Sequence, residues 1–164
     1  MTTALLVESI AAEIRDATKN LRLPIEYHNE VQRRAEETWR AVNVYEQMIP
    51  NDLFQNDNYY PCVVVSWLDT RDKLSGDRIE SVATIGLSCG VFAKEADGWK
   101  DCLHLTELIR QRLLRVRTIA QRFRLSDDIT WMSAPDQPLP FFFSYAELEY
   151  GIYLPQEPFD SLIP

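Results

Sequence analysis

Two runs of alternating polarity constrain the fold of this chain more than any other feature. In residues 81–93 the odd positions from Ala83 onward are apolar, whereas positions 84, 86, 88 and 90 hold only small residues. Residues 141–154 alternate in a similar way, and each run is typical of a strand with one buried face. Between them, after an Asp97-Gly98 turn, residues 99–114 place apolar side chains at helical spacing. This order predicts an α+β module in which a helix packs on an antiparallel sheet.

The other segments extend this module to a mostly antiparallel β-sheet flanked by two or three helices, in the order α-β-β-α-β-β. Helical spacing predicts an opening helix at residues 4–20 and a second helix at residues 99–117, capped by Asp97. Apolar and β-branched runs predict strands at residues 42–46, 62–68 and 129–132. Alternating charges suit an exposed helix at residues 25–40. Three further segments are expected to be loops, the middle one long, charged and mobile: residues 51–60, 69–80 and 133–140.

Composition indicates a soluble globular protein made and used in a cytoplasm. The chain has 164 residues, which suits one domain, and we assign it to residues 1–155 with a tail at 156–164. The net charge of −8 argues against tight binding of a phosphate backbone. The three cysteines form no CxxC pair, so we expect small buried side chains. The sequence has no basic leader and no apolar run of membrane-spanning length, so neither a signal peptide nor a membrane partner is expected.

Motifs for catalysis, metal binding or nucleotide binding are missing from the sequence, so we expect no enzyme and no cofactor. His104 is expected on the polar side of the second helix, and His28 has no evident partner. No glycine belongs to a phosphate-binding loop. Gly86 and Gly90 indicate either a twisted or bulged strand, or close packing of a neighbouring subunit or helix. Glu147 and Glu149 share one strand face, which is typical of a solvated face rather than an acid–base pair.

Several segments together resemble the tail terminator proteins of long-tailed bacteriophages and prophages. The resemblance covers residues 42–155 and the opening helix. It is carried by patterns of residue class and is less specific than a metal-binding or phosphate-loop motif. The segments that carry it are Tyr60-Pro61-Cys62-Val63-Val64-Val65, Gly90-Val91-Phe92, Asp97-Gly98-Trp99-Lys100-Asp101-Cys102-Leu103, Ile109-Arg110-Gln111-Arg112-Leu113-Leu114, Phe123-Arg124-Leu125, Ile129-Thr130-Trp131 and Asp136-Gln137-Pro138-Leu139-Pro140.

The resemblance implies a structural subunit of the virion. Tail terminators are α+β domains that assemble as a hexameric ring, cap the tail tube, stop its polymerisation and present the surface to which the filled head docks. The implied partners are further copies of the chain, the major tail tube protein and the head–tail connector or stopper. DNA would pass through the ring without specific binding. The protein would assemble in the bacterial cytoplasm and reside at the junction of tail and head.

A closed ring needs two different complementary patches on each subunit, and we assign residues to them as hypotheses. The subunit interface is expected to combine basic and acidic side chains: Arg110, Arg112 and Arg115 with Glu80 and Asp72. The tube or connector contacts are expected in the two charged or proline-rich loops: Arg71, Lys73, Arg78, Asp136 and Gln137. Glu147 and Glu149 are expected to face the lumen. The alternatives are another head–tail joining or tail-completion protein, or a small-molecule-binding domain with its pocket floor at Gly86 and Gly90.

Overall fold

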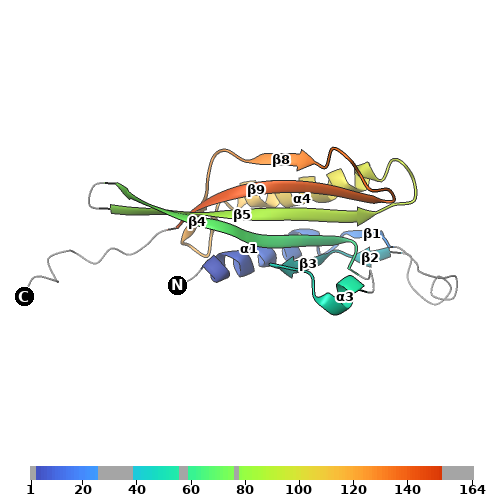
Figure 1. Cartoon of the computed structure of the whole chain (residues 1–164), viewed down its shortest axis with the longest axis horizontal. Helices are drawn as coiled ribbons and strands as arrows, with labels where there is room; N and C mark the ends of the chain where they lie inside the picture. Colours follow the sequence, from blue (N-terminus) through green and yellow to red (C-terminus); the bar gives the residue numbers. More distant parts are fainter. Residues whose placement is uncertain (1–2, 26–38, 56–58, 76–77, 153–164) are drawn as a thin grey trace, which may run out of the picture.

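A long antiparallel hairpin formed by β4 (Cys62–Ser75) and β5 (Arg78–Phe92) runs the length of the computed structural model (Figure 1). The structure describes residues 3–25, 39–55, 59–75 and 78–152. The prediction of a long loop at residues 69–80 is wrong, because β4 and β5 remain paired as far as Ser75 and Arg78. The pairing register shifts between Trp67 and Asp69, which leaves Leu68 as an extra residue on β4.

The hairpin lies within a seven-stranded, mostly antiparallel sheet of an α+β fold. The strand order is β3-β4-β5-β9-β7-β6, and β8 also pairs with β9. The β3–β4 pair is parallel, and β1 and β2 form a separate two-stranded sheet. The remaining elements are α1 (Thr3–Thr18), β1 (Arg22–Pro24), β2 (Trp39–Ala41), β3 (Asn43–Glu46), α3 (Asn51–Gln55), α4 (Trp99–Arg115), β6 (Thr118–Ile119), β7 (Phe123–Leu125), β8 (Thr130–Ser133) and β9 (Phe141–Ile152).

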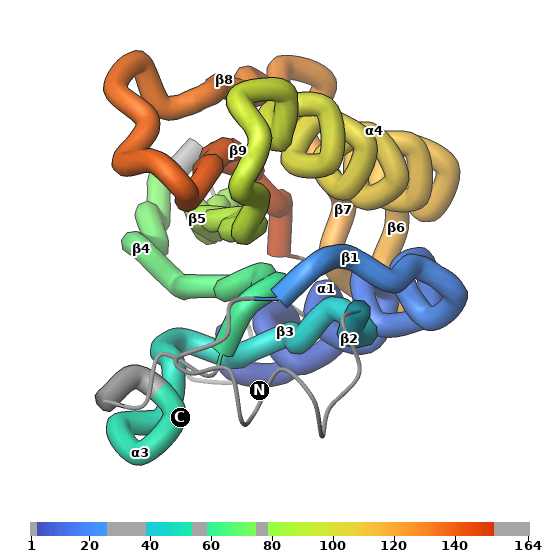
Figure 2. Tube along the Cα trace, turned by 90° about the vertical axis from the view of Figure 1, so that its right-hand side faces the viewer, coloured from blue at the N-terminus to red at the C-terminus, as the bar shows by residue number. Residues whose placement is uncertain are grey.

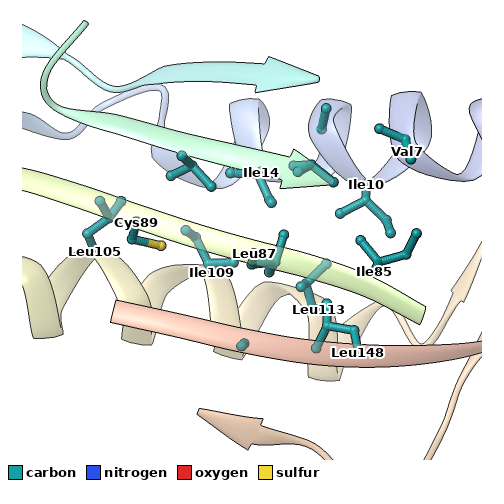
Figure 3. Packing of buried hydrophobic residues seen from close by; sticks show 14 of the residues in the cluster. Val7, Ile10, Ile14, Ile85, Leu87, Cys89, Leu105, Ile109, Leu113 and Leu148 are labelled. Carbon is teal, nitrogen blue, oxygen red and sulfur yellow. The ribbon is translucent and has the colours of Figure 1, made fainter. Parts of the chain in front are cut away.

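Helices α1 and α4 lie side by side and pack on the same face of the curled sheet (Figure 2). The odd residues of β5 point into this layer, and Ile85, Leu87 and Cys89 are almost completely buried. Figure 3 shows them among side chains of both helices, including Ile10 of α1 and Ile109 of α4. Each large aliphatic side chain removed from water in this way contributes about 1.5–3 kcal/mol. The alternation predicted for residues 81–93 and 141–154 is confirmed over the part that the structure describes, because the predicted apolar positions of both strands are buried on the face that meets the helices.

The opposite face of β5 is covered by side chains of the same chain. A Cβ atom at Gly90 would lie 2.8 Å from the Tyr60 ring and 3.1 Å from the Phe143 ring. A Cβ atom at Gly86 would lie 3.2 Å from the extra residue Leu68. These glycines therefore make room for aromatic and aliphatic side chains, and the expected pocket floor is filled.

The element order departs from the expected α-β-β-α-β-β, because the structure contains more strands than predicted. The polar segment after residue 50 begins with the short helix α3, where a loop was expected. Residues 39–41 form strand β2, while residues 26–38 of the expected exposed helix lie outside the described residues, as do His28 and the tail at 156–164. Helix α4 begins after Gly98 without a side-chain cap, so the assignment of Asp97 as the cap is wrong.

Candidate assembly surfaces

The far end of the hairpin projects beyond both helices, at the left of Figure 1. The last residue pair between β5 and β9 is Ser81 with Ile152, and Asp72 pairs with Ser81, so beyond this point residues 73–75 and 78–80 pair only with each other among the described residues. We call these two segments the arm. Its inward face presents Leu74 and Ile79, which lie directly opposite each other and are 73% and 50% exposed. An exposed apolar pair at the end of a projecting hairpin is a contact surface that the described part of the chain leaves uncovered.

The charged residues expected in a loop are distributed over the two faces of the arm. Lys73 and Glu80 are opposite each other on the outward face and both are exposed. Asp72 accepts a hydrogen bond from the Ser81 hydroxyl. The backbone of Arg78 begins β5, but its side chain lies outside the described residues. Successive side chains of a strand point to opposite faces. Because both faces of the arm are exposed to solvent, charged residues at successive positions are compatible with a strand here.

At the base of the arm, the structure brings together two residues that were assigned to different surfaces. The Arg71 guanidinium forms an ion pair with Glu149 on β9 and lies 3.9 Å from Asp69. The negative charge of Glu149 is therefore balanced within the subunit. Glu147 is exposed on the same face, opposite Gly86 and Thr130. Of the two expected lumen-facing acids, Glu147 alone is in no ion pair with another described residue.

A groove of about 250 Å³ lies between α4, β8 and the beginning of β9. Its rim is formed by three apolar side chains that are each about half exposed: Trp99, Leu103 and Met132. The Phe142 ring and a buried hydroxyl pair, Thr106 and Ser144, belong to the same lining. The Thr106 and Ser144 oxygens are 2.6 Å apart, and the Thr106 hydroxyl donates to the Cys102 carbonyl at 2.7 Å. The groove is thus predominantly apolar, with polar atoms that are already hydrogen-bonded to each other.

The proline-rich loop beside this groove is held in place by Gln137. Its amide nitrogen donates to the carbonyl oxygens of Phe143 at 3.0 Å and Ala134 at 2.9 Å. Its amide oxygen accepts from the Phe143 backbone nitrogen at 2.7 Å. The Gln137 side chain therefore hydrogen-bonds both backbone groups of Phe143, as the backbone of a neighbouring strand would. Gln137 shapes the groove, while the neighbouring Asp136 is exposed.

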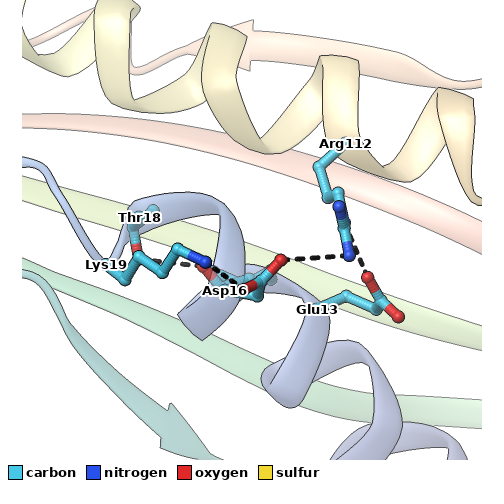
Figure 4. A network of polar contacts seen from close by, with 6 residues as sticks. Glu13, Asp16, Thr18, Lys19 and Arg112 are labelled. Atoms are coloured by element: carbon cyan, nitrogen blue, oxygen red, sulfur yellow. Dashed lines mark hydrogen bonds and ion pairs between the residues drawn. The ribbon is translucent and has the colours of Figure 1, made fainter.

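Two of the three arginines assigned to the subunit interface are paired within the subunit. Arg112 of α4 donates to Glu13 of α1 at 2.7 Å and lies 3.1 Å from Asp16 (Figure 4). Arg110 pairs with Glu107 one turn away at 3.1 Å. The Lys19 ammonium group, first, and then the Arg112 guanidinium hold the pKa of Asp16 below its ordinary value. Arg115 is exposed and is in no ion pair with another described residue, so it remains available for a partner.

The described residues offer little for redox, metal or acid–base chemistry. All three cysteines are buried and free, as expected, and burial raises the pKa of the Cys62 and Cys89 thiols to about 12. No group of three His, Cys, Asp or Glu side chains in the described ranges could hold a metal ion. His104 is exposed on α4, as expected. Within the same ranges, no helix is long and apolar enough to cross a membrane.

The groove is the surface that the sequence did not predict. Trp99 at its rim is 52% exposed, although tryptophan side chains are on average largely buried. A signal was present in α4, because Trp99 and Leu103 are one turn apart and outside the apolar stripe that includes Cys102 and Leu105. Two apolar residues on the polar side of an amphipathic helix indicate a second contact surface.

No family model matches the chain, and no curated protein matches it either.

Proposed function

We propose that the protein is a structural subunit that assembles head to tail into a closed ring, and that this ring terminates the tail tube of a long-tailed phage or prophage. The ring would be hexameric, would stop polymerisation of the tube protein and would offer the docking surface for the head. The role as a tail terminator is inferred from the resemblance in sequence. Its physical support is the arm with the exposed pair Leu74 and Ile79.

The arm supports assembly because it is a specific surface on only one end of the subunit. A head-to-tail interface joins two different patches, and a closed ring follows when the rotation between neighbours closes. The groove beside α4 provides a second, different apolar surface. A subunit with one projecting patch and one recessed patch suits repeated contacts of this kind.

Several residue assignments follow within this proposal. Arg115 is retained as an interface residue, whereas Arg110 and Arg112 already have partners within the subunit. Lys73 and Asp136 are exposed and remain candidates for contacts with the tail tube protein or the head–tail connector, whereas Arg71 is already paired with Glu149. Glu147 is the remaining candidate for the lumen. An acidic side chain there would repel the passing DNA and prevent it from adhering.

Light scattering over a range of protein concentrations, with negative-stain images of the same samples, tests the assembly. We expect particles of about six times 19.1 kDa with a central hole, either from the protein alone or after purified tail tubes are added. Tubes capped at one end by such rings would support the terminator function. A protein that remains monomeric with and without tubes would refute it.

The groove also favours a second candidate function, the binding of a small apolar molecule. It combines an open apolar rim with a hydrogen-bonded hydroxyl pair, a composition typical of ligand sites. Native mass spectrometry of the purified protein separates the two functions. A co-purifying ligand on a strict monomer would favour this second function.

A further inference from the structure

We propose that the groove between α4, β8 and β9 receives the arm of a neighbouring copy of the chain, with Leu74 and Ile79 packing against Trp99, Leu103 and Met132. This inference rests on the proposed head-to-tail assembly and names the two surfaces that form its interface. The groove in this scheme is one half of a subunit contact.

The two surfaces lie at opposite ends of the same strand, so a subunit cannot fill its own groove. The groove is lined by Phe143 and Ser144 of β9, which pair with Gly90 and Cys89 near the end of β5. Ile79 is in the arm at the beginning of β5. Ten residues of strand separate Ile79 from Cys89, or about 33 Å at about 3.3 Å per residue. The pairing along the whole of β5 holds the arm extended, so only another copy can bring an arm to the groove.

The chemistry of the two surfaces is complementary. The arm projects two aliphatic side chains, and the groove offers an aromatic and aliphatic rim around a recess of about 250 Å³. Burial of such side chains in a recess, with water excluded around them, is the usual source of interface affinity. Each surface alone is small, so each can remain exposed on a monomer until a neighbour covers it.

Charges near the two ends also favour a contact between different ends over a contact between identical ones. Arg124 is exposed on β7 and pairs in the sheet with Gly151, close to the base of the arm. Arg115, at the end of α4, is exposed as well. At the other end, Lys100 is paired with Asp97, which leaves Asp101 in the first turn of α4 and the exposed Asp136, adjacent to Gln137, as acidic side chains near the groove. Opposite charges around two apolar patches steer the correct pair together.

Site-directed cross-linking tests the contact directly. Leu74→Cys is mixed with Leu103→Cys and treated with a short thiol-specific cross-linker; the native thiols are at most 5% exposed and do not interfere. We expect a covalent dimer of about twice 19.1 kDa in the mixture. Leu74→Cys mixed with Leu114→Cys, which places the thiol elsewhere on α4, is the matched control and should give no dimer. A dimer from Leu74→Cys alone would mean that two arms contact each other, which contradicts the inference.

Complementation between two interface variants gives an independent test. Leu74→Asp disables the arm and Leu103→Asp disables the groove, and each variant alone should be monomeric. An equimolar mixture still has one intact arm and one intact groove, so it should yield a heterodimer and nothing larger. Leu114→Asp should assemble as the wild type does. Circular dichroism checks that the variants are folded, which we expect because both positions are at least half exposed.

The outcomes separate this inference from the proposed function. If wild-type rings form but the Leu74–Leu103 cross-link does not, and Leu74→Asp still forms rings, the contact is wrong and the ring function stands. If the cross-link forms but the protein gives only open chains, the contact stands and the closed ring is wrong. If the Leu74–Leu103 cross-link does not form and the wild-type protein does not assemble on tail tubes, both are overturned.

Discussion

The buried hydroxyl pair beneath the groove predicts a mutation whose effect on stability changes sign with its background. Thr106 and Ser144 are 5% and 6% exposed, and their oxygens are 2.6 Å apart. Thr106 has a single hydroxyl proton, which it donates to the Cys102 carbonyl at 2.7 Å. The Ser144 hydroxyl must therefore be the donor between the two side chains.

This order of donors fixes the expected free energies of unfolding. Ser144→Ala removes one hydrogen bond but leaves Thr106 with its carbonyl partner, so it should cost about 0.5–1.5 kcal/mol. Thr106→Val takes away the oxygen acceptor of the buried Ser144 hydroxyl and leaves it only the Cys89 and Cys102 sulfurs, which are weak acceptors, so this change should cost about 1–3 kcal/mol. Adding Ser144→Ala to Thr106→Val removes the weakly satisfied hydroxyl. The same serine substitution should then be neutral or stabilising.

Urea unfolding of the four proteins of this double-mutant cycle, followed by tryptophan fluorescence, measures the effect. The Leu74→Asp background is suitable, because assembly would make the midpoint depend on protein concentration. For a chain of this size, 1 kcal/mol corresponds to a shift of about 2–4 °C in Tm, so thermal melts provide a second measurement. If Ser144→Ala destabilises both backgrounds equally, the two hydroxyls are not coupled and the argument is refuted.

Three further predictions concern packing, ionisation and the helix–helix bridge. Gly98→Ala should lower the free energy of unfolding by about 1–3 kcal/mol, because its Cβ would lie 2.2 Å from another side-chain carbon. Gly151→Ala should be tolerated, because the nearest atom to its Cβ would be 3.8 Å away. Equal urea midpoints for the two variants would contradict this prediction. The pKa of the Cys89 thiol is raised by burial from 9.0 to about 12, so its contribution to stability is full below pH 9 and is lost as the pH rises toward 12. Urea midpoints should fall between pH 9 and pH 12, and they should fall less steeply in Cys89→Ala. A midpoint that does not change with pH would argue against this contribution of the thiol. Arg112→Ala should lower Tm while Arg115→Ala should not, and similar melts for both would show that the bridge to α1 is unimportant.

The main strands and helices could be predicted from sequence because burial on one face imposes a period on the residues. In β5 and β9 the period is two, and Ile85 and Leu148 fall on the buried face as expected. In α4 the apolar stripe through Ile109 and Leu113 identifies the helix. The arm was missed for the opposite reason. The described residues bury neither of its faces, so no period of burial marks it, and its charges resemble those of a loop.

The candidate surfaces depend on distant pairs that local patterns do not contain. Glu13 precedes Arg112 by 99 residues, and nothing near either residue indicates that they meet. Glu149 and Arg71 are similarly remote in sequence and meet because β9 and β4 flank β5. A charge pattern could therefore predict that these residues are polar and accessible, but it could not predict which partner each one selects.

Because the arm and the groove lie near opposite ends of β5, the length of this strand sets the distance between the two surfaces in any assembly built from this contact. Its 15 residues span about 50 Å at about 3.3 Å per residue. Adding or removing two paired residues in each of β4 and β5 would keep every side chain on its present face and change the span by about 7 Å. A change of one residue would turn the buried face of the strand outward. In a ring built from this contact, the distance between neighbouring subunits could therefore vary only in steps of a dipeptide, and the diameter of such a ring would be encoded in the length of a single hairpin.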